Sequence, residues 1–379
     1  GPDVWRADPG PALSMTTDRG VALIGTIKGR CIATGKLLPT LAVGAAGGGI
    51  AYAFDIPLPW LLGALIATTV LSLGGVRLRA PTTSRKAVLV VIGVMLGAAF
   101  TPDMTGDVAL WGTSLVLMLL ATAVMMAFSV WFGRRVAGYS MATAMYSGVP
   151  GGVSAVTLMA ADSEADLRVV GLTHAVRILV LLVAIPPALD LVGHVSLQSR
   201  RLTLDEWLAV PGFGDALLLV GAGIIGMWLG RRLHLPNPLL FGPVLLSGAL
   251  HVSGVTEAAI PPTIVALAQI IIGVSVGVRF GGTSLATVGT NLMMAVLQAV
   301  ALLLITIVAA WLVNALTGYS TAALLLAYMP GGAPELSLVA LSLGIDPAFV
   351  TSHHLLRISV LVLLLPALLR IAMRRMHNA

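Results

Sequence analysis

The sequence GVPGGVSAVTLMAADSEADLRVVGLTHAVRI, residues 148–178, returns later in the chain as MPGGAPELSLVALSLGIDPAFVTSHHLLRI, residues 329–358. The tripeptide Pro-Gly-Gly that begins at Pro150 recurs at Pro330, an offset of 180 positions. The same offset aligns further residues of the two stretches: Gly151 and Gly152 with Gly331 and Gly332, Asp166 with Asp346, His174 with His354, and Arg177 with Arg357. A fixed offset of this kind indicates an internal duplication, in which each copy forms one structural unit.

The alignment continues upstream of both stretches, where Pro57 and Pro59 match Pro236 and Pro238 at an offset of 179. We therefore expect two tandem structural repeats joined by a polar linker. The expected boundaries are a polar N-terminal segment at 1–36, a first membrane repeat at 37–195, the linker at 196–213, a second membrane repeat at 214–373 and a basic C-terminal tail at 374–379.

The composition is typical of a membrane protein, with 58% hydrophobic and only 10% charged residues. The apolar residues form stretches of about 17 to 25, each long enough to cross roughly 30 Å of hydrocarbon as a helix. Examples are Leu58–Val76, Ala109–Phe132 and Met293–Val313. The sequence therefore predicts an all-α polytopic membrane protein embedded in a lipid bilayer.

The net charge of +6 does not indicate nucleic-acid binding, because the basic residues form short clusters between apolar segments and so report membrane topology. These clusters contain Arg77, Arg79, Arg85 and Lys86; Arg134 and Arg135; Arg231 and Arg232; and Arg370, Arg374 and Arg375. The single cysteine, Cys31, excludes an internal disulfide framework and a cysteine-based metal site.

Each repeat contains about five clear apolar spans and a sixth that is interrupted at Pro-Gly-Gly, with about ten apolar residues on either side. An arm of ten helical residues covers about 15 Å, half of the hydrocarbon thickness. The interrupted element is therefore either a broken helix that crosses the membrane or a re-entrant hairpin. If it crosses, each repeat has six spans and the repeats are parallel; if it re-enters, each has five and they are inverted.

The distribution of charge favours inverted repeats. With a cytoplasmic N-terminus, the inverted arrangement places Arg231, Arg232 and Arg279 on the cytoplasmic side together with the basic C-terminus. It leaves only Arg200 and Arg201 outside, where the neighbouring Asp205 and Glu206 offset their charge.

The two Pro-Gly-Gly breaks are candidate substrate-binding elements. Proline has no amide hydrogen and glycine has free choice of φ, so the tripeptide ends a helix and leaves backbone groups unpaired. Lipid cannot satisfy these groups, and in transporters such breaks mark the binding site. A kink in a crowded helix bundle is the alternative. A helix is expected to start after each break, and the N-terminus of a helix favours an anion. The small polar residues at these helix starts extend the candidate set: Ser154, Thr157 and Ser337.

Five charged or titratable side chains complete the candidate site. Arg177 and Arg357 either bind backbone carbonyls freed by the breaks or clamp an anionic substrate, and the two roles are compatible. Glu335, opposite Ala155, is a candidate proton carrier or arginine partner, although it could simply face an aqueous vestibule. His174 and His354 either relay protons or are only hydrogen bonded. We expect Asp166 and Asp346 to cap the last helix of each repeat.

The two quoted stretches resemble the duplicated signature of the AbrB-type bacterial inner-membrane proteins, and the resemblance covers the chain from about Lys36. It implies a multi-pass protein of the bacterial inner membrane. Members carry the labels ammonia monooxygenase and transition-state regulator. A copper or iron monooxygenase needs a cluster of ligands, whereas the membrane histidines here are His174, His353 and His354. A DNA-binding role would need a soluble recognition domain, for which no segment is long enough.

These features together favour a secondary transporter of a small anionic or zwitterionic solute, coupled to H⁺ or Na⁺. Its binding site would lie at the middle of the membrane, between the two repeats. We expect neither an enzyme nor a cofactor or metal, and we leave a homo-oligomer open. Two other classes remain as alternatives: a membrane-embedded enzyme such as a monooxygenase, and a membrane sensor that regulates gene expression indirectly through a partner.

Overall fold

The computed structural model describes residues 37–102, 105–151, 156, 159–161, 163–193, 203–281 and 285–377. Within these ranges every regular element is a helix, as the all-α prediction requires. The first half contains α2 (Leu37–Ala53), α3 (Pro59–Leu73), α4 (Thr82–Gly97), α5 (Thr105–Arg135), α6 (Met141–Gly148) and α8 (Leu167–Gly193). Between the two halves lies α9 (Leu204–Leu208). The second half contains α10 (Phe213–Arg232), α11 (Pro238–Val252), α12 (Pro262–Gly277), the 3-10 turn η2 (Val278–Phe280), α13 (Leu285–Thr317), α14 (Thr321–Tyr328), α15 (Ala333–Leu343) and α16 (Pro347–His377).

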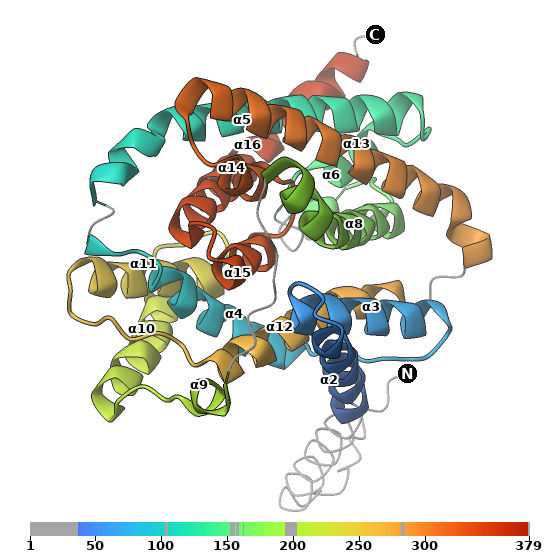
Figure 1. The fold of residues 1–379 in the computed structure, drawn as a ribbon. Coiled ribbons are helices and arrows are strands. Elements are labelled where there is room, and N and C mark those ends of the chain that lie inside the picture. Colours follow the sequence, from blue (N-terminus) through green and yellow to red (C-terminus); the bar gives the residue numbers. More distant parts are fainter. Residues whose placement is uncertain are drawn as a thin grey trace, which may run out of the picture.

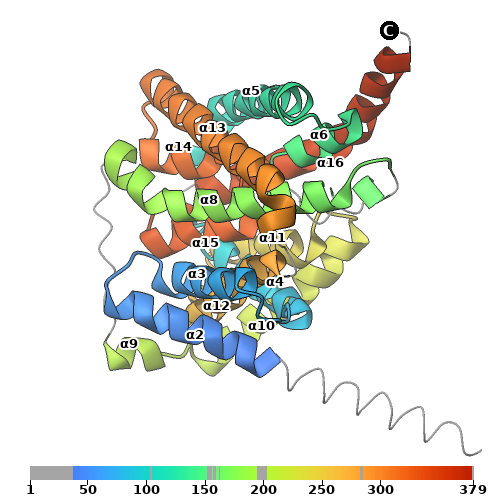
Figure 2. The same ribbon diagram turned by 90° about the vertical axis from the view of Figure 1, so that its right-hand side faces the viewer.

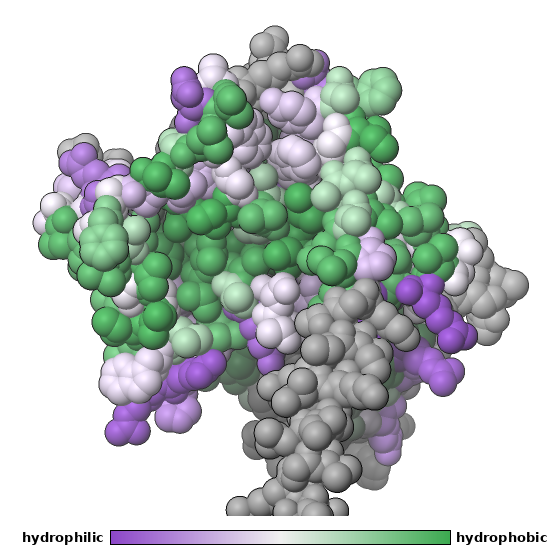
Figure 3. Space-filling model, turned by 90° about the horizontal axis from the view of Figure 1, so that it is seen from below, coloured by the Kyte–Doolittle hydropathy of each residue, from purple (hydrophilic) through white to green (hydrophobic). Residues whose placement is uncertain are grey.

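The surface and the helix lengths are those of a polytopic membrane protein. Six segments of the described chain are long and apolar enough to cross a bilayer: Trp111–Arg135, Leu167–Gly193, Phe213–Arg232, Pro262–Phe280, Gly289–Thr317 and Pro347–Leu365. The face seen in Figure 3 carries a broad hydrophobic surface, with hydrophilic residues gathered toward its edges. On α10, the side chains of Leu217, Ile224 and Trp228 are exposed and form an apolar stripe along one helix face.

The helices form two bundles that lie one above the other in Figures 1 and 2. We call the lower one, made of α2–α4 and α10–α12, the glycine bundle. The upper one, made of α5, α6, α8 and α13–α16, is the hairpin bundle. In the glycine bundle α4 packs on α11 and α12 packs on α3, so helices of the two halves of the chain interlock.

Glycine residues allow the helices of the glycine bundle to pack backbone against backbone. Gly63 lies so close to the carbonyl oxygen of Gly47 that a methyl group at either position would overlap the other helix, and Gly242 meets Gly226 in the same way. A methyl group on Gly93 would come within 2.5 Å of the Leu240 carbonyl oxygen. Helices without a hydrophobic driving force between them associate through such close contacts of small residues.

The starts of the helices correspond between the two halves of the chain. The first residues of α4, α5, α6 and α8 recur 180 positions later at α12, α13, α14 and α16, and α3 recurs at α11 after 179. The first-half counterpart of α15 would begin at position 153, which is outside the described residues.

In the second half the chain doubles back at Pro-Gly-Gly. Tyr319, just before α14, packs its ring on Phe349 at the start of α16, with ring centroids 5.3 Å apart. At the inner end of α14, the carbonyls of Tyr328 and Met329 reach Arg357, ten residues into α16. Helix α15 then leads back to the start of α16 through three residues. Both outer ends of the α14–α15 element therefore lie at the same end of α16, which is the geometry of a hairpin.

Helix α6 has the same relation to α8. Near its start, the Thr143 hydroxyl accepts a hydrogen bond of 2.9 Å from the amide of Asp166, the residue that precedes α8. Beyond its inner end, the carbonyl of Val149 binds Arg177, ten residues into α8. Helix α6 thus enters beside the start of α8 and ends at the depth of Arg177.

Candidate functional site

In the second half, Arg357 holds the inner end of α14. Its Nη1 donates hydrogen bonds to the carbonyls of Tyr328 at 3.2 Å and Met329 at 2.9 Å, and its Nη2 donates to Nδ1 of His354. The Nε2 of His354 is 3.1 Å from the carbonyl of Leu326. Arg357 and His354 are both fully buried, so this network lies deep inside the protein.

Arg177 makes the equivalent network in the first half. Its Nη1 donates to the carbonyl of Ser147 at 3.3 Å, and its Nη2 donates to the carbonyl of Val149 at 2.6 Å and to Nδ1 of His174 at 2.7 Å. The Nε2 of His174 is 3.0 Å from the carbonyl of Tyr146. Two arginine–histidine pairs, 180 residues apart, thus hold the ends of two short helices.

The need for these contacts follows from the sequence of each break. The last carbonyls of a helix have no amide partner, and Pro150 and Pro330 supply none. A guanidinium at a helix C-terminus both donates to these carbonyls and neutralises the negative end of the helix dipole. The geometry of Arg177 and Arg357 is therefore that of carbonyl-binding groups. The Nε of each has no hydrogen-bond partner among the described residues, so one donor of each remains uncommitted.

The hydrogen bonds also define the tautomer of both histidines. A carbonyl oxygen only accepts hydrogen bonds, so Nε2 of His174 and of His354 must carry the hydrogen. Nδ1 then accepts from the guanidinium beside it. Adding a proton to Nδ1 would place two donors against each other, so a proton-relay role for either histidine requires its arginine to move first.

The two Pro-Gly-Gly turns meet inside the protein. A methyl group built on Gly151 would lie 3.6 Å from the carbonyl oxygen of Gly331 and 3.7 Å from Cγ1 of Ile358. The charges of Arg177 and Arg357 are close enough to repel each other. Pro150 and Pro330, the first residues of the two turns, are both buried. The breaks thus lie side by side.

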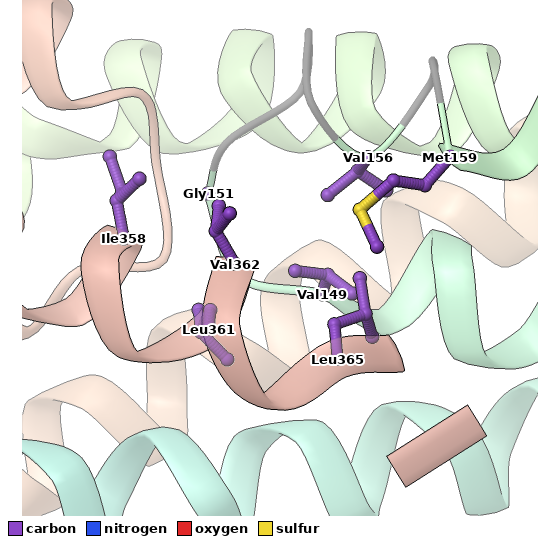
Figure 4. Close-up of a pocket in the computed structure, with 8 residues that line it drawn as sticks. All are labelled: Val149, Gly151, Val156, Met159, Ile358, Leu361, Val362 and Leu365. Atoms are coloured by element: carbon purple, nitrogen blue, oxygen red, sulfur yellow. The ribbon is translucent and has the colours of Figure 1, made fainter. Parts of the chain in front are cut away.

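The described residues line one small pocket beside the turns. A pocket of about 10 Å³ lies between the first turn and α16, lined by the eight apolar residues labelled in Figure 4: Val149, Gly151, Val156, Met159, Ile358, Leu361, Val362 and Leu365. This volume holds about one water molecule.

Glu335 is the buried carboxylate of the described chain, with 2% of its surface exposed. It is the third residue of α15, and its carboxylate folds back over Gly332, leaving no room for a side chain there. A carboxylate at this position is stabilised by the positive end of the helix dipole. Its Oε1 is 4.0 Å from Nη2 of Arg85 on α4, whereas Oε2 has no hydrogen-bond partner in the described part of the chain.

Arg85 and Arg279 are site residues that the sequence did not identify as such. In the sequence both stand beside apolar segments, a position that is typical of residues that set membrane topology. Arg279, in η2, is attracted by Glu335 and repelled by Arg85, and its charge also reaches His174. One signal was available for Arg279: it directly follows Pro262–Val278, a stretch without charged residues.

The other predicted residues have three kinds of position. Ser337 is buried on α15, and its hydroxyl has no hydrogen-bond partner among the described residues. Asp166 Oδ1 accepts hydrogen bonds from the amides of Arg168 and Val169, and Asp346 Oδ1 accepts one from Phe349, which is N-cap geometry. Gly152, Ser154 and Thr157 lie outside the described residues.

The adjacent histidines of α16 point to different partners. His354 binds the α14 carbonyl, whereas His353 bonds to the Ser114 hydroxyl on α5 at 2.9 Å and to the Phe349 carbonyl at 2.8 Å. Among the residues that the structure describes, no group of three or more His, Cys, Asp or Glu side chains could hold a metal ion.

Fold and site together define a helical protein of membrane type with two arginine-held helix breaks in contact at its centre. The chain belongs to the family described as "Transition state regulatory protein AbrB", whose profile matches residues 60–373. The resemblance drawn from the Pro-Gly-Gly stretches is thereby confirmed.

Two relatives extend over most of the chain. A protein of Escherichia coli (strain K12) named "Putative regulator AbrB" is 25% identical over 320 residues, which cover 84% of this chain and 91% of that protein. The "Uncharacterized protein YhjN" of Bacillus subtilis (strain 168) is 22% identical over 356 residues, covering 87% of this chain and 91% of that protein.

Proposed function

We propose that the protein is a secondary transporter of a small anionic or zwitterionic solute, coupled to H⁺ or Na⁺. One observation carries the proposal: the turns at Gly151 and Gly331 are in contact, and each is held by a buried arginine. Broken helices that meet near the membrane midplane are the typical binding element of secondary transporters.

The proposal includes a duplicated and inverted architecture. The matching helix starts in the two halves support duplication. If the element at each Pro-Gly-Gly is a re-entrant hairpin, each half crosses the membrane five times, through α2, α3, α4, α5 and α8 or through their counterparts. An odd number of crossings inverts the second half. We place the protein in the bacterial inner membrane with its N-terminus in the cytoplasm, following the charge distribution of the sequence.

The excess of buried positive charge supports an anionic solute. Arg177 and Arg357 are at most 1% exposed, whereas Glu335 is the one buried carboxylate of the described chain. Charges inside a membrane are costly unless they are compensated. A solute that brings negative charge to this place would lower that cost, and a cation would raise it.

Alternating access requires part of the structure to move, and the contact between the two bundles favours movement there. The glycine bundle is held by close backbone contacts. The two bundles meet mainly where α4, α12 and η2 pack against α8, α15 and α16. An apolar groove of about 520 Å³ between α3 and α8 further separates them at one edge. Displacing one bundle against the other would separate Arg85 from Glu335 and open the site.

The test is flux through the purified protein in proteoliposomes. A panel of organic anions, amino acids and cations is offered with an imposed H⁺ or Na⁺ gradient. We expect gradient-dependent uptake of at least one anion or zwitterion, and loss of that uptake in Arg357→Ala. Absence of flux for the whole panel, together with stoichiometric copper or iron in the purified protein, would favour a membrane-embedded oxygenase instead.

A further inference from the structure

Arg85 and Glu335 form a contact between the two bundles that is too long to be a hydrogen-bonded ion pair. Arg85 lies on α4 of the glycine bundle and Glu335 on α15 of the hairpin bundle. Their closest atoms are 4.0 Å apart, beyond the roughly 2.7–2.9 Å of a charge-assisted hydrogen bond. Nε of Arg85 and Oε2 of Glu335 are both buried without a hydrogen-bond partner in the described chain. Such unpaired atoms are costly, and an anion that accepts a hydrogen bond from Nε of Arg85 would remove part of that cost.

Arg279 adds a second cation within electrostatic reach of this contact. It lies in η2, at the end of α12, and interacts electrostatically with both Arg85 and Glu335. The cluster therefore holds two guanidinium groups for one carboxylate. Neither guanidinium is the one that holds a Pro-Gly-Gly turn, because that role belongs to Arg177 and Arg357.

The surroundings of Glu335 add positive rather than negative charge. Helix α15 packs against α4, α14 and α16. The titratable or charged side chains of the site on these elements and on η2 are Arg85, Tyr328, His353, His354, Arg357 and Arg279. The excess of cations makes an anion the ligand that the site favours, and two negative charges offset it better than one.

We propose, building on the transport function above, that Arg85 and Arg279 form the carboxylate-binding subsite for a small dicarboxylate solute. Glu335 is the internal anion that faces these arginines while no solute is bound. The planar fork of arginine binds carboxylates in two-pronged fashion, which explains why arginines rather than lysines stand here. The side chain of Arg85 is 27% exposed and that of Glu335 is 3% exposed, so the solute reaches the subsite from the Arg85 side.

The subsite is tested by ligand binding to the detergent-purified full chain, without any transport measurement. The probes are succinate, acetate and choline chloride at matched ionic strength, and the readout is the shift of the thermal unfolding midpoint. We expect succinate to raise the midpoint more than acetate, and choline chloride to leave it unchanged. Arg85→Gln and Arg279→Gln should each weaken succinate binding about tenfold or more, as loss of a charge-assisted hydrogen bond does.

Three further variants separate binding from folding. Arg232→Gln, at an exposed position at the end of α10, should bind succinate as the wild type does. Arg85→Lys keeps the charge but loses the fork, so its affinity should lie between those of the wild type and Arg85→Gln. Glu335→Gln removes the internal competitor and should bind succinate more tightly than the wild type. A purely structural ion pair would not produce tighter binding.

The outcomes separate this inference from the proposed function. If wild-type protein shows no succinate-dependent shift, or if Arg85→Gln and Arg279→Gln bind succinate normally, the subsite is wrong even where proteoliposomes transport another solute. If succinate binds as expected but no anion is transported, the subsite stands and the transport function is wrong.

Discussion

Gly151 faces the carbonyl oxygen of Gly331, and a methyl group on Gly151 would lie 3.6 Å from that oxygen. The two residues are 180 positions apart, yet they bring the turns of two helix breaks into contact. Gly151 also has φ of +104°, a conformation that other residues adopt only under strain. The conformation thus makes glycine the residue of choice at this position, whereas the contact distances are ordinary van der Waals distances.

Replacing Gly151 by alanine should therefore destabilise the protein. The positive φ alone should cost about 1–3 kcal/mol, and the thermal unfolding midpoint in detergent should fall. Gly171→Ala on α8 is the matched control, because a methyl group there meets no atom within 4 Å. That control should be neutral or stabilising by up to about 1 kcal/mol. Equal effects of the two substitutions would show that the turn carries no strain.

Arg357→Ala should abolish uptake of the transported solute. It leaves the buried carbonyls of Tyr328 and Met329 without their donor, at about 1–3 kcal/mol for each unsatisfied group. Uptake into proteoliposomes is the measurement. Asp166→Asn is the comparison, since asparagine caps a helix about as well as aspartate does and uptake should change little. If both variants lost uptake to the same extent, the division into clamp and cap would be wrong.

Glu335→Gln should remove the dependence of uptake on an imposed pH gradient if this carboxylate carries the coupled proton. Glutamine keeps the shape of the side chain but cannot exchange a proton in this way. The initial rate of uptake is measured with and without the gradient, using Glu164→Gln at an exposed site as control. A variant whose uptake still follows the pH gradient would exclude Glu335 as the coupling group.

Gly47→Ala should destabilise the glycine bundle, because the added methyl group would collide with the carbonyl oxygen of Gly63 on α3. Overpacking of this kind costs about 1–3 kcal/mol. Gly49→Ala, on the same helix, meets no atom within 4 Å and should be tolerated. The two variants are compared by thermal unfolding and by size-exclusion chromatography in detergent. Identical profiles would mean that the helices can move apart at no cost.

The sequence predicted those parts of the structure that depend on local chemistry. Pro-Gly-Gly ends a helix wherever it occurs, so both breaks were predictable. Arg357 binds the Met329 carbonyl at the end of α14. Binding of carbonyls freed by the break is one of the two roles that the sequence predicts for this arginine. The apolar stretch Leu58–Val76 likewise predicted α3, which spans Pro59–Leu73. Ala109–Phe132 fell short of α5, Thr105–Arg135, because the helix continues through polar residues at both ends.

The parts that depend on distant partners were not predictable. Arg85 and Glu335 are 250 positions apart and on different bundles, and no pattern of spacing connects them. Arginines at the ends of apolar segments are also common for reasons of topology, so Arg85 and Arg279 carried no distinct functional signal. Helix α4 of the first half packs on α11 of the second half. Such an exchange of helices between the halves depends on tertiary structure, and hydrophobic periodicity along the chain does not predict it.

That exchange has a consequence for how the chain can be divided. Helix α4 finds its main neighbour in α11 and helix α12 finds its own in α3, so either half made alone would lack a surface that its glycines are shaped to meet. Two separately translated halves should assemble only when produced together in one cell. If the two halves arose by duplication, as proposed above, a single-copy forerunner would have been stable only as a pair of chains.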